Sequence, residues 1–284
     1  MRPFEDSLRE GNLDETLREL QDQVRKQPAD AKLRIFLFQL LALMGQWERA
    51  MTQLKVAGEL DAGALALVQT YREALQCEAL RADIFAGTRS PLVLGEPEEW
   101  LALQMEALRL SAQGAGEQAR SARERALEAA PATPGTIDGA PFEWIMDGDS
   151  RLGPVLEAIV NGRYYWVPFH RIRTIRLEEP EDLRDLVWMP AYFTWANEGE
   201  AVGLIPTRYT GSESSPDPEI RRARRTEWIE QGAETYSGLG QRMLFTDAGE
   251  YSLMDVRLIE LQTQDASAEG RADDAAPQAG GPIG

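Results

Sequence analysis

Apolar residues in the first half of the chain recur every three or four positions, which is the spacing of a buried stripe on an α-helix. The spacing is clear over residues 61–86 and 97–111. Between these segments, glycine and proline residues at 87–91 and 95–97 predict a loop and the start of the next helix. No strand-like alternation interrupts the pattern, so the first half is predicted to be helical.

The same half contains an internal repeat. Residues 11–13 (Gly-Asn-Leu) return 34 positions later as residues 45–47 (Gly-Gln-Trp), and a third copy begins at Gly114, one position out of phase. Each copy places a glycine where a first helix should end, and Pro28, Ala62 or Pro131 stands where a second helix should stop. This pattern resembles the tetratricopeptide repeat, an array of stacked helical hairpins. The alternative is an ordinary helical bundle in which the repeat is accidental.

Beyond a turn-rich segment at residues 131–135, the pattern changes to short runs of aromatic and β-branched residues separated by Gly, Pro and Asn. These runs predict a series of short strands, and residues 151–160 are predicted to form a short helix that leads into them. The predicted strands cover residues 163–167, 174–177, 186–195, 201–205, 242–245 and 251–261. Short strands at this density are typical of a small barrel or a strongly bent sheet.

The chain is therefore predicted to be α+β. A tetratricopeptide-like α-helical hairpin array should cover residues 1–130, and a small β-rich, barrel-like domain should cover residues 131–263. From residue 265 onward the only large apolar side chain is Ile283. Such a segment cannot bury enough surface to order itself, so residues 264–284 are predicted to be a disordered tail.

Composition and charge narrow the function. The formal net charge of −17 argues against nucleic-acid binding, which needs a basic surface, and it disfavours docking on an anionic membrane. The single cysteine, Cys77, excludes an internal disulfide, and its helical context predicts a small buried side chain. The most apolar stretch, residues 35–44, is too short to span a bilayer, and residues 1–10 lack a signal-peptide core. These features predict a cytoplasmic protein that binds neither nucleic acid nor membrane.

No catalytic or metal-binding pattern rises above background. The only histidine, His170, has no nucleophile motif beside it and is predicted to be a surface residue. Residues 147–150 (Asp-Gly-Asp-Ser) resemble the opening of a calcium loop, but Leu152 and Ala158 stand where the loop needs glycine and glutamate. The segment is therefore predicted to be a turn in which Asp149 or Ser150 caps a following helix. We expect no catalytic residue, no metal site and no cofactor.

Two other classes of function stay open at this stage. If the chain is a hydrolase or transferase, its reaction centre should lie in the β-rich domain near Asp138, Glu143, Asp147 and Asp149. If it is a scaffold, it should self-assemble through its helical hairpins. The only basic run, at residues 221–225, is predicted to be a solvated helix face or a spot that docks an acidic surface.

Stacked helical hairpins present a groove that commonly takes an extended peptide or an amphipathic helix. In the tetratricopeptide register, one helix of the second copy turns a mixed apolar and polar strip towards this groove. The candidate partner-binding residues on that strip are Lys32, Ile35, Gln39, Ala42 and Leu43. The alternative is that Ile35 and Leu43 pack on the preceding helices.

Several longer strings resemble one protein family rather than repeats in general. One of them is Tyr164-Tyr165-Trp166-Val167-Pro168-Phe169, and the others cover residues 29–34, 46–50, 131–139, 142–145, 149–157, 182–188, 204–209 and 225–228. Together they resemble the ImpE/TagJ (SciE-type) accessory proteins of bacterial type VI secretion systems. The resemblance covers roughly residues 7–261 and leaves the C-terminal tail outside.

The resemblance implies a cytoplasmic, non-catalytic adaptor. Its implied partner is the small (TssB-like) subunit of the contractile sheath, bound through the N-terminal helix of that subunit. It also implies an indirect link to the ClpV-type AAA+ ATPase that recycles the sheath. No residue-level binding motif comes with the resemblance.

Overall fold

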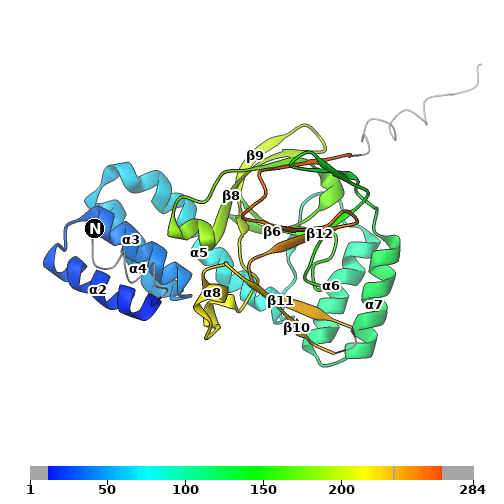
Figure 1. Cartoon of the computed structure of the whole chain (residues 1–284), viewed down its shortest axis with the longest axis horizontal. Coiled ribbons are helices and arrows are strands. Elements are labelled where there is room, and N and C mark those ends of the chain that lie inside the picture. The colour runs from blue at the N-terminus through cyan, green and yellow to red at the C-terminus, as the bar shows by residue number, and fades with distance from the viewer. Residues whose placement is uncertain (1–11, 233, 264–284) are drawn as a thin grey trace, which may run out of the picture.

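The computed structural model describes residues 12–232 and 234–263, so the predicted tail at 264–284 lies outside the described residues. Helices come first and strands follow, which confirms the α+β prediction (Figure 1). The helices before the main strands are α2 (Leu13–Lys26), α3 (Ala31–Leu43), α4 (Trp47–Leu60), α5 (Leu65–Phe85), α6 (Glu99–Ala112) and α7 (Gly116–Ala129).

The helix ends follow from capping residues. The Asp30 side chain accepts hydrogen bonds from the N–H groups of Lys32 and Leu33 and so begins α3. Gly45 ends α3 with a φ of 69°, and Gly114 follows α6 with a φ of 75°, as left-handed C-caps do. Ala50 and Ala119 are fully buried, which lets α4 approach α3 and α7 approach α6. Hairpins therefore occur at the second and third predicted glycines, whereas the first, Gly11, lies outside the described residues and the tetratricopeptide-like array stays a prediction.

The largest sheet has the strand order β1-β6-β5-β9-β8-β7-β14-β2-β3. With β1 and β3 at its two edges, the described sheet is open and does not form the closed barrel that was one predicted outcome. Its strands are β1 (Leu92–Val93), β2 (Gly135–Ile137), β3 (Ala140–Phe142), β5 (Val155–Val160), β6 (Arg163–Pro168), β7 (Ile172–Leu177), β8 (Trp188–Trp195), β9 (Glu200–Pro206) and β14 (Leu258–Leu261).

Two small sheets lie beside it. One has the order β13-β12-β4, with β4 at Ile145–Asp147, β12 at Met243–Thr246 and β13 at Glu250–Ser252. The other is a hairpin of β10 (Thr226–Glu230) and β11 (Tyr236–Gly240), which Figure 1 places beside the lower ends of α6 and α7.

The predicted helix at 151–160 is wrong. Residues 151–154 form a turn, and β5 follows with every one of its side chains buried. A short apolar run that is buried on both faces has no strand-like alternation, so periodicity cannot separate it from a buried helix. The predicted strand at 251–261 is in fact two strands, β13 and β14, and the one predicted at 186–195 begins only at Trp188.

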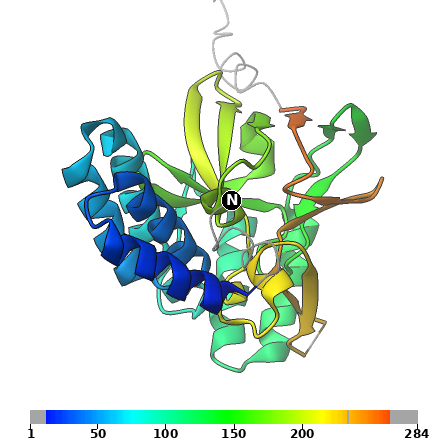
Figure 2. The same cartoon turned by 60° about the vertical axis from the view of Figure 1, so that its left-hand side comes forward.

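One hydrophobic core joins the helices to the sheet. The ring of Trp188 on β8 is fully buried, and its centre lies 6.0 Å from that of Trp47 on α4 and 5.8 Å from that of Tyr71 on α5. A second core lies between the strands and includes Phe169, Phe193 and Leu244. Figure 2 shows the N-terminal helices standing against one side of the strands. Within the described ranges, none of the helices combines the length and the hydropathy that crossing a bilayer would require.

Candidate partner-binding site

A chain of buried charges fixes the strands around the site. Arg242, just before β12, is fully buried and forms ion pairs with Asp147 at the end of β4 and with Glu157 on β5. Arg81 of α5 donates from Nε to the same Glu157 carboxylate over 2.6 Å, and the Tyr164 hydroxyl also donates to it. The network ties a helix of the first half to three strands of the second half, β4, β5 and β6.

Burial and neighbouring charges oppose each other in this network. Burial alone would raise the pKa of Glu157, but Arg81 and Arg242 lower it to about 2. Asp147 has one guanidinium partner rather than two, and burial raises its pKa to about 6. Of these two carboxylates, Glu157 therefore holds its negative charge more firmly at neutral pH.

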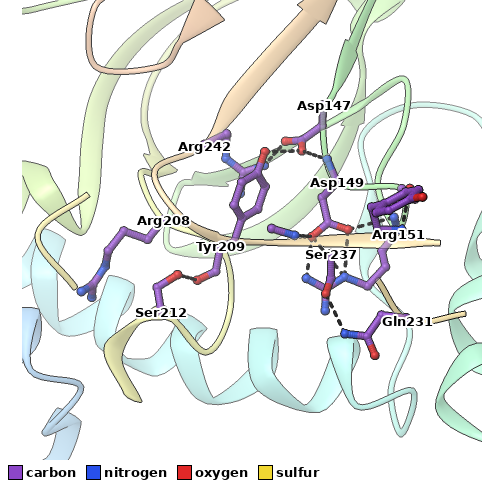
Figure 3. A network of polar contacts seen from close by, with 12 residues as sticks. Asp147, Asp149, Arg151, Arg208, Tyr209, Ser212, Gln231, Ser237 and Arg242 are labelled. Carbon is purple, nitrogen blue, oxygen red and sulfur yellow. Dashed lines mark hydrogen bonds and ion pairs between the residues drawn. The ribbon is translucent and has the colours of Figure 1, made fainter. Parts of the chain in front are cut away.

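The turn at residues 147–150 supports the β10–β11 hairpin (Figure 3). The N–H of Asp149 donates to Asp147 over 2.8 Å, and the Asp149 carboxylate pairs with Arg151 and accepts from the N–H of Gly238 over 3.0 Å. Ser150 and Tyr236 exchange two further hydrogen bonds, of 3.0 Å and 3.1 Å. The prediction that Asp149 or Ser150 caps a helix is wrong, because the side chains instead hold a strand of a distant hairpin.

A pocket with a volume of ≈ 590 Å³ opens where this turn, the β10–β11 hairpin and α7 meet. Its apolar wall comes from Leu127, Met146, Trp228, Tyr236 and Phe245. The Trp228 ring packs against Tyr209 and Phe245, whose ring centres lie 5.7 Å and 5.5 Å away. Gly148 allows this approach, since a Cβ at that position would lie 2.5 Å from the Trp228 ring.

Arg123 of α7 also lines the pocket and is 94% buried, at a relative exposure of 6%. It donates from Nη1 to the Thr235 hydroxyl over 2.9 Å, whereas its Nε has no hydrogen-bond partner in the described structure. Burial lowers the pKa of Arg123, with the Asp149 and Glu124 charges acting in the opposite direction. Within the described ranges, this guanidinium forms no ion pair.

The sequence singled out residues 147–150 but missed the pocket. Arg123 lies among Ala119, Ala122 and Ala126, which form the buried face of α7. A charged residue on an otherwise small and buried helix face was the available signal. The lining residues outside α7 come from residues 146–153 and from segments about 100 positions further on, and no local pattern connects them to α7.

The five residues of the predicted groove lie at different depths. Lys32 is exposed and Ile35 is partly buried, whereas Gln39, Ala42 and Leu43 are buried at 3% exposure or less. In the described conformation, a partner could therefore reach only the first two.

Other residues noted in the sequence have structural contacts. His170 is partly buried rather than at the open surface, with Nε2 3.0 Å from a Glu98 carboxylate oxygen. Cys77 is buried as predicted, and burial raises its pKa to about 12. The basic run does not form one solvated face, because α8 (Pro218–Arg221) ends inside it and Arg222 is buried.

The carboxylates considered for catalysis do not converge on an open site. Asp138 accepts the N–H groups of Arg257 and Leu258, Asp147 and Asp149 are buried in ion pairs, and Glu143 is exposed. Across residues 12–232 and 234–263, no group of three or more His, Cys, Asp or Glu side chains is placed to hold a metal ion. What the geometry offers is an apolar pocket with a buried cation in its wall, which suits recognition of another molecule.

Comparisons with known proteins found a family match, a similar protein and a similar solved structure. The family model described as "ImpE protein" matches residues 139–260. The type VI secretion system accessory component TagJ of Pseudomonas aeruginosa is 54% identical over 262 residues, which cover 92% of each chain. The crystal structure of the protein VPA1032 from Vibrio parahaemolyticus superimposes with a TM-score of 0.81 at 25% identity, over 92% of this chain and 98% of that one.

Proposed function

Since the chain belongs to the ImpE family, we propose that it is an accessory component of a type VI secretion system. The observation that carries this proposal is the 54% identity to the TagJ component over nearly the whole of both chains. Coverage of this extent leaves little room for a different architecture in either protein.

Within that role, we propose a non-enzymatic adaptor that acts in the cytoplasm. Its partner would be the N-terminal helix of the small, TssB-like subunit of the contractile sheath, and through that subunit it would be linked to recycling by the ClpV-type ATPase. An apolar pocket suits an amphipathic helix, which binds by laying its apolar face into such a surface. On the tetratricopeptide-like register, Lys32 and Ile35 on α3 offer a competing contact surface for the same helix.

The test is a calorimetric titration of the full chain with a synthetic peptide of the sheath subunit's N-terminal helix. A peptide of the same composition in scrambled order is the matched control, because it has the same charge but no apolar face. The proposal predicts saturable binding with a dissociation constant below about 100 μM and none for the scrambled peptide. Equal heats for both peptides, or none for either, would remove this partner from the account.

A further inference from the structure

We propose that the pocket between α7 and the β10–β11 hairpin is where the partner helix is held. One apolar side chain of the helix would sit against Trp228, and a neighbouring carboxylate of the helix would pair with Arg123. This inference rests on the proposed function for the identity of the helix, and it adds the surface and the chemistry of recognition.

Arg123 is a buried cation that the described residues compensate poorly. A buried charge is expensive to keep unless an opposite charge and hydrogen bonds compensate for its lost hydration. Arg123 donates a hydrogen bond to the neutral hydroxyl of Thr235, and its Nε has no partner in the described structure. The nearby Asp149 carboxylate is already bonded to Arg151 and Gly238. A carboxylate that enters the pocket would satisfy Arg123 where the chain itself does not.

The apolar wall of the pocket is partly open to solvent. Large apolar side chains exposed together mark a surface that a partner covers. Leu127, Trp228 and Tyr236 line this one pocket and are 43%, 37% and 45% exposed. Tryptophan and tyrosine in such positions are common anchors of protein interfaces, because each presents a large rigid surface with little conformational entropy to lose.

The opening of the pocket carries more acidic than basic side chains. Glu124, Glu234 and Glu250 line it and are exposed, and Arg120, which also lines it, pairs with Glu124 and Glu234. The expected occupant is therefore a helix with an apolar side chain and a carboxylate facing inward and with basic residues at its flanks. A fatty or wholly apolar ligand would leave Arg123 without a partner and would gain nothing from the acidic opening.

A second apolar pocket, between α5 and β9, provides the comparison. It has a volume of ≈ 500 Å³ and carries the highly exposed Val202, at 63%. The guanidinium in its wall, Arg184, already pairs with Asp182. It therefore lacks the unpaired cation that distinguishes the α7 pocket, and Val202 is a suitable site for a control substitution.

The experiment repeats the peptide titration on three full-length variants and measures the melting temperature of each. Arg123→Met and Trp228→Ala should each weaken binding at least about tenfold, and Val202→Ala should leave it unchanged. Arg123→Met should keep or raise the melting temperature, because it replaces a poorly compensated buried charge with an apolar chain of similar length. A merely structural arginine would lower the melting temperature and leave the affinity intact.

A double-mutant cycle tests the carboxylate directly. Neutralising the acidic residues of the peptide should weaken binding to the unaltered chain but not to Arg123→Met. If the unaltered chain binds the peptide and both pocket variants bind equally well, the pocket proposal is overturned while the proposed function stands. If the unaltered chain binds no peptide, the proposed function fails first and the pocket proposal with it.

Discussion

Glu157 shows at the scale of one residue how the fold keeps charge in its interior. Its carboxylate is fully buried and accepts from Arg81, Arg242 and Tyr164. A neutral amide at this position would leave two buried guanidinium groups without a shared negative charge. We predict that Glu157→Gln lowers the free energy of unfolding by about 3–5 kcal/mol, measured by urea denaturation.

Glu200 on β9 is the matched control, because it is an exposed glutamate in the same sheet. Glu200→Gln should change the free energy of unfolding by less than about 0.5 kcal/mol. Similar, small effects for both substitutions would mean that the buried network contributes little to stability.

Predictions for single residues were confirmed where the neighbouring sequence determines whether the side chain is buried. Cys77 lies in an apolar helical pattern and is buried, as the pattern predicts. The predictions for Asp149 and Arg222 were wrong, because the residues around them come from distant chain segments that a local sequence pattern does not include. Asp149 meets Gly238, 89 positions further on, and that contact exists only in the folded chain.

At the scale of elements, Arg208 connects the helical and β-rich parts. It is buried, and its Nη1 donates to the carbonyl of Leu43, the last residue of α3, over 2.9 Å and to the carbonyl of Arg221. Burial lowers the pKa of Arg208 to about 10, so the group is still charged at neutral pH. A positive charge at the C-terminal end of a helix also interacts favourably with the helix dipole.

We predict that Arg208→Met loosens the end of α3. The Leu43 carbonyl loses a buried donor, which should cost about 1–3 kcal/mol and speed amide hydrogen exchange in the last turn of α3 and the first of α4. Arg163→Met, at an exposed position of β6, is the control and should leave exchange unchanged. Uniformly faster exchange across the whole chain would argue against a local connection.

The elements that the sequence predicted best are those with their own end signals. Gly45 and Gly114 mark the ends of α3 and α6 because a left-handed C-cap favours glycine whatever the tertiary context. Strand β5 has no such signal, and β1 consists of two residues that pair in parallel with β6. Neither could be recognised from a local pattern.

At the scale of the whole molecule, a shared core joins parts that the sequence separates at residue 130. Trp188 of the β-rich part packs on Trp47 and Tyr71 of the helical part, and Arg81 pairs with Glu157 across the same boundary. We predict that the chain unfolds in one cooperative transition, with equal calorimetric and van 't Hoff enthalpies. Two resolved transitions would show instead that the parts fold independently.

The composition change at residue 131 therefore predicts where strands begin but not where cores divide. Burial across the boundary depends on contacts such as that of Trp188 on β8 with Tyr71 on α5. Hydrophobic periodicity predicts that each of these residues is buried, but it does not identify the residue that each one packs against. The α7 pocket could not be predicted for the same reason. Arg123 in its wall donates a hydrogen bond to Thr235, which lies 112 positions further along the sequence.

The most direct test of the adaptor account is site-specific photo-cross-linking of the full chain to the purified small sheath subunit. Benzoylphenylalanine would replace Tyr236 at the α7 pocket in one variant and Lys32 on α3 in another; both positions are exposed. We predict a cross-linked product from position 236, mapped to the N-terminal helix of the sheath subunit, and none from position 32. Cross-linking only from position 32, or from neither, would contradict the account.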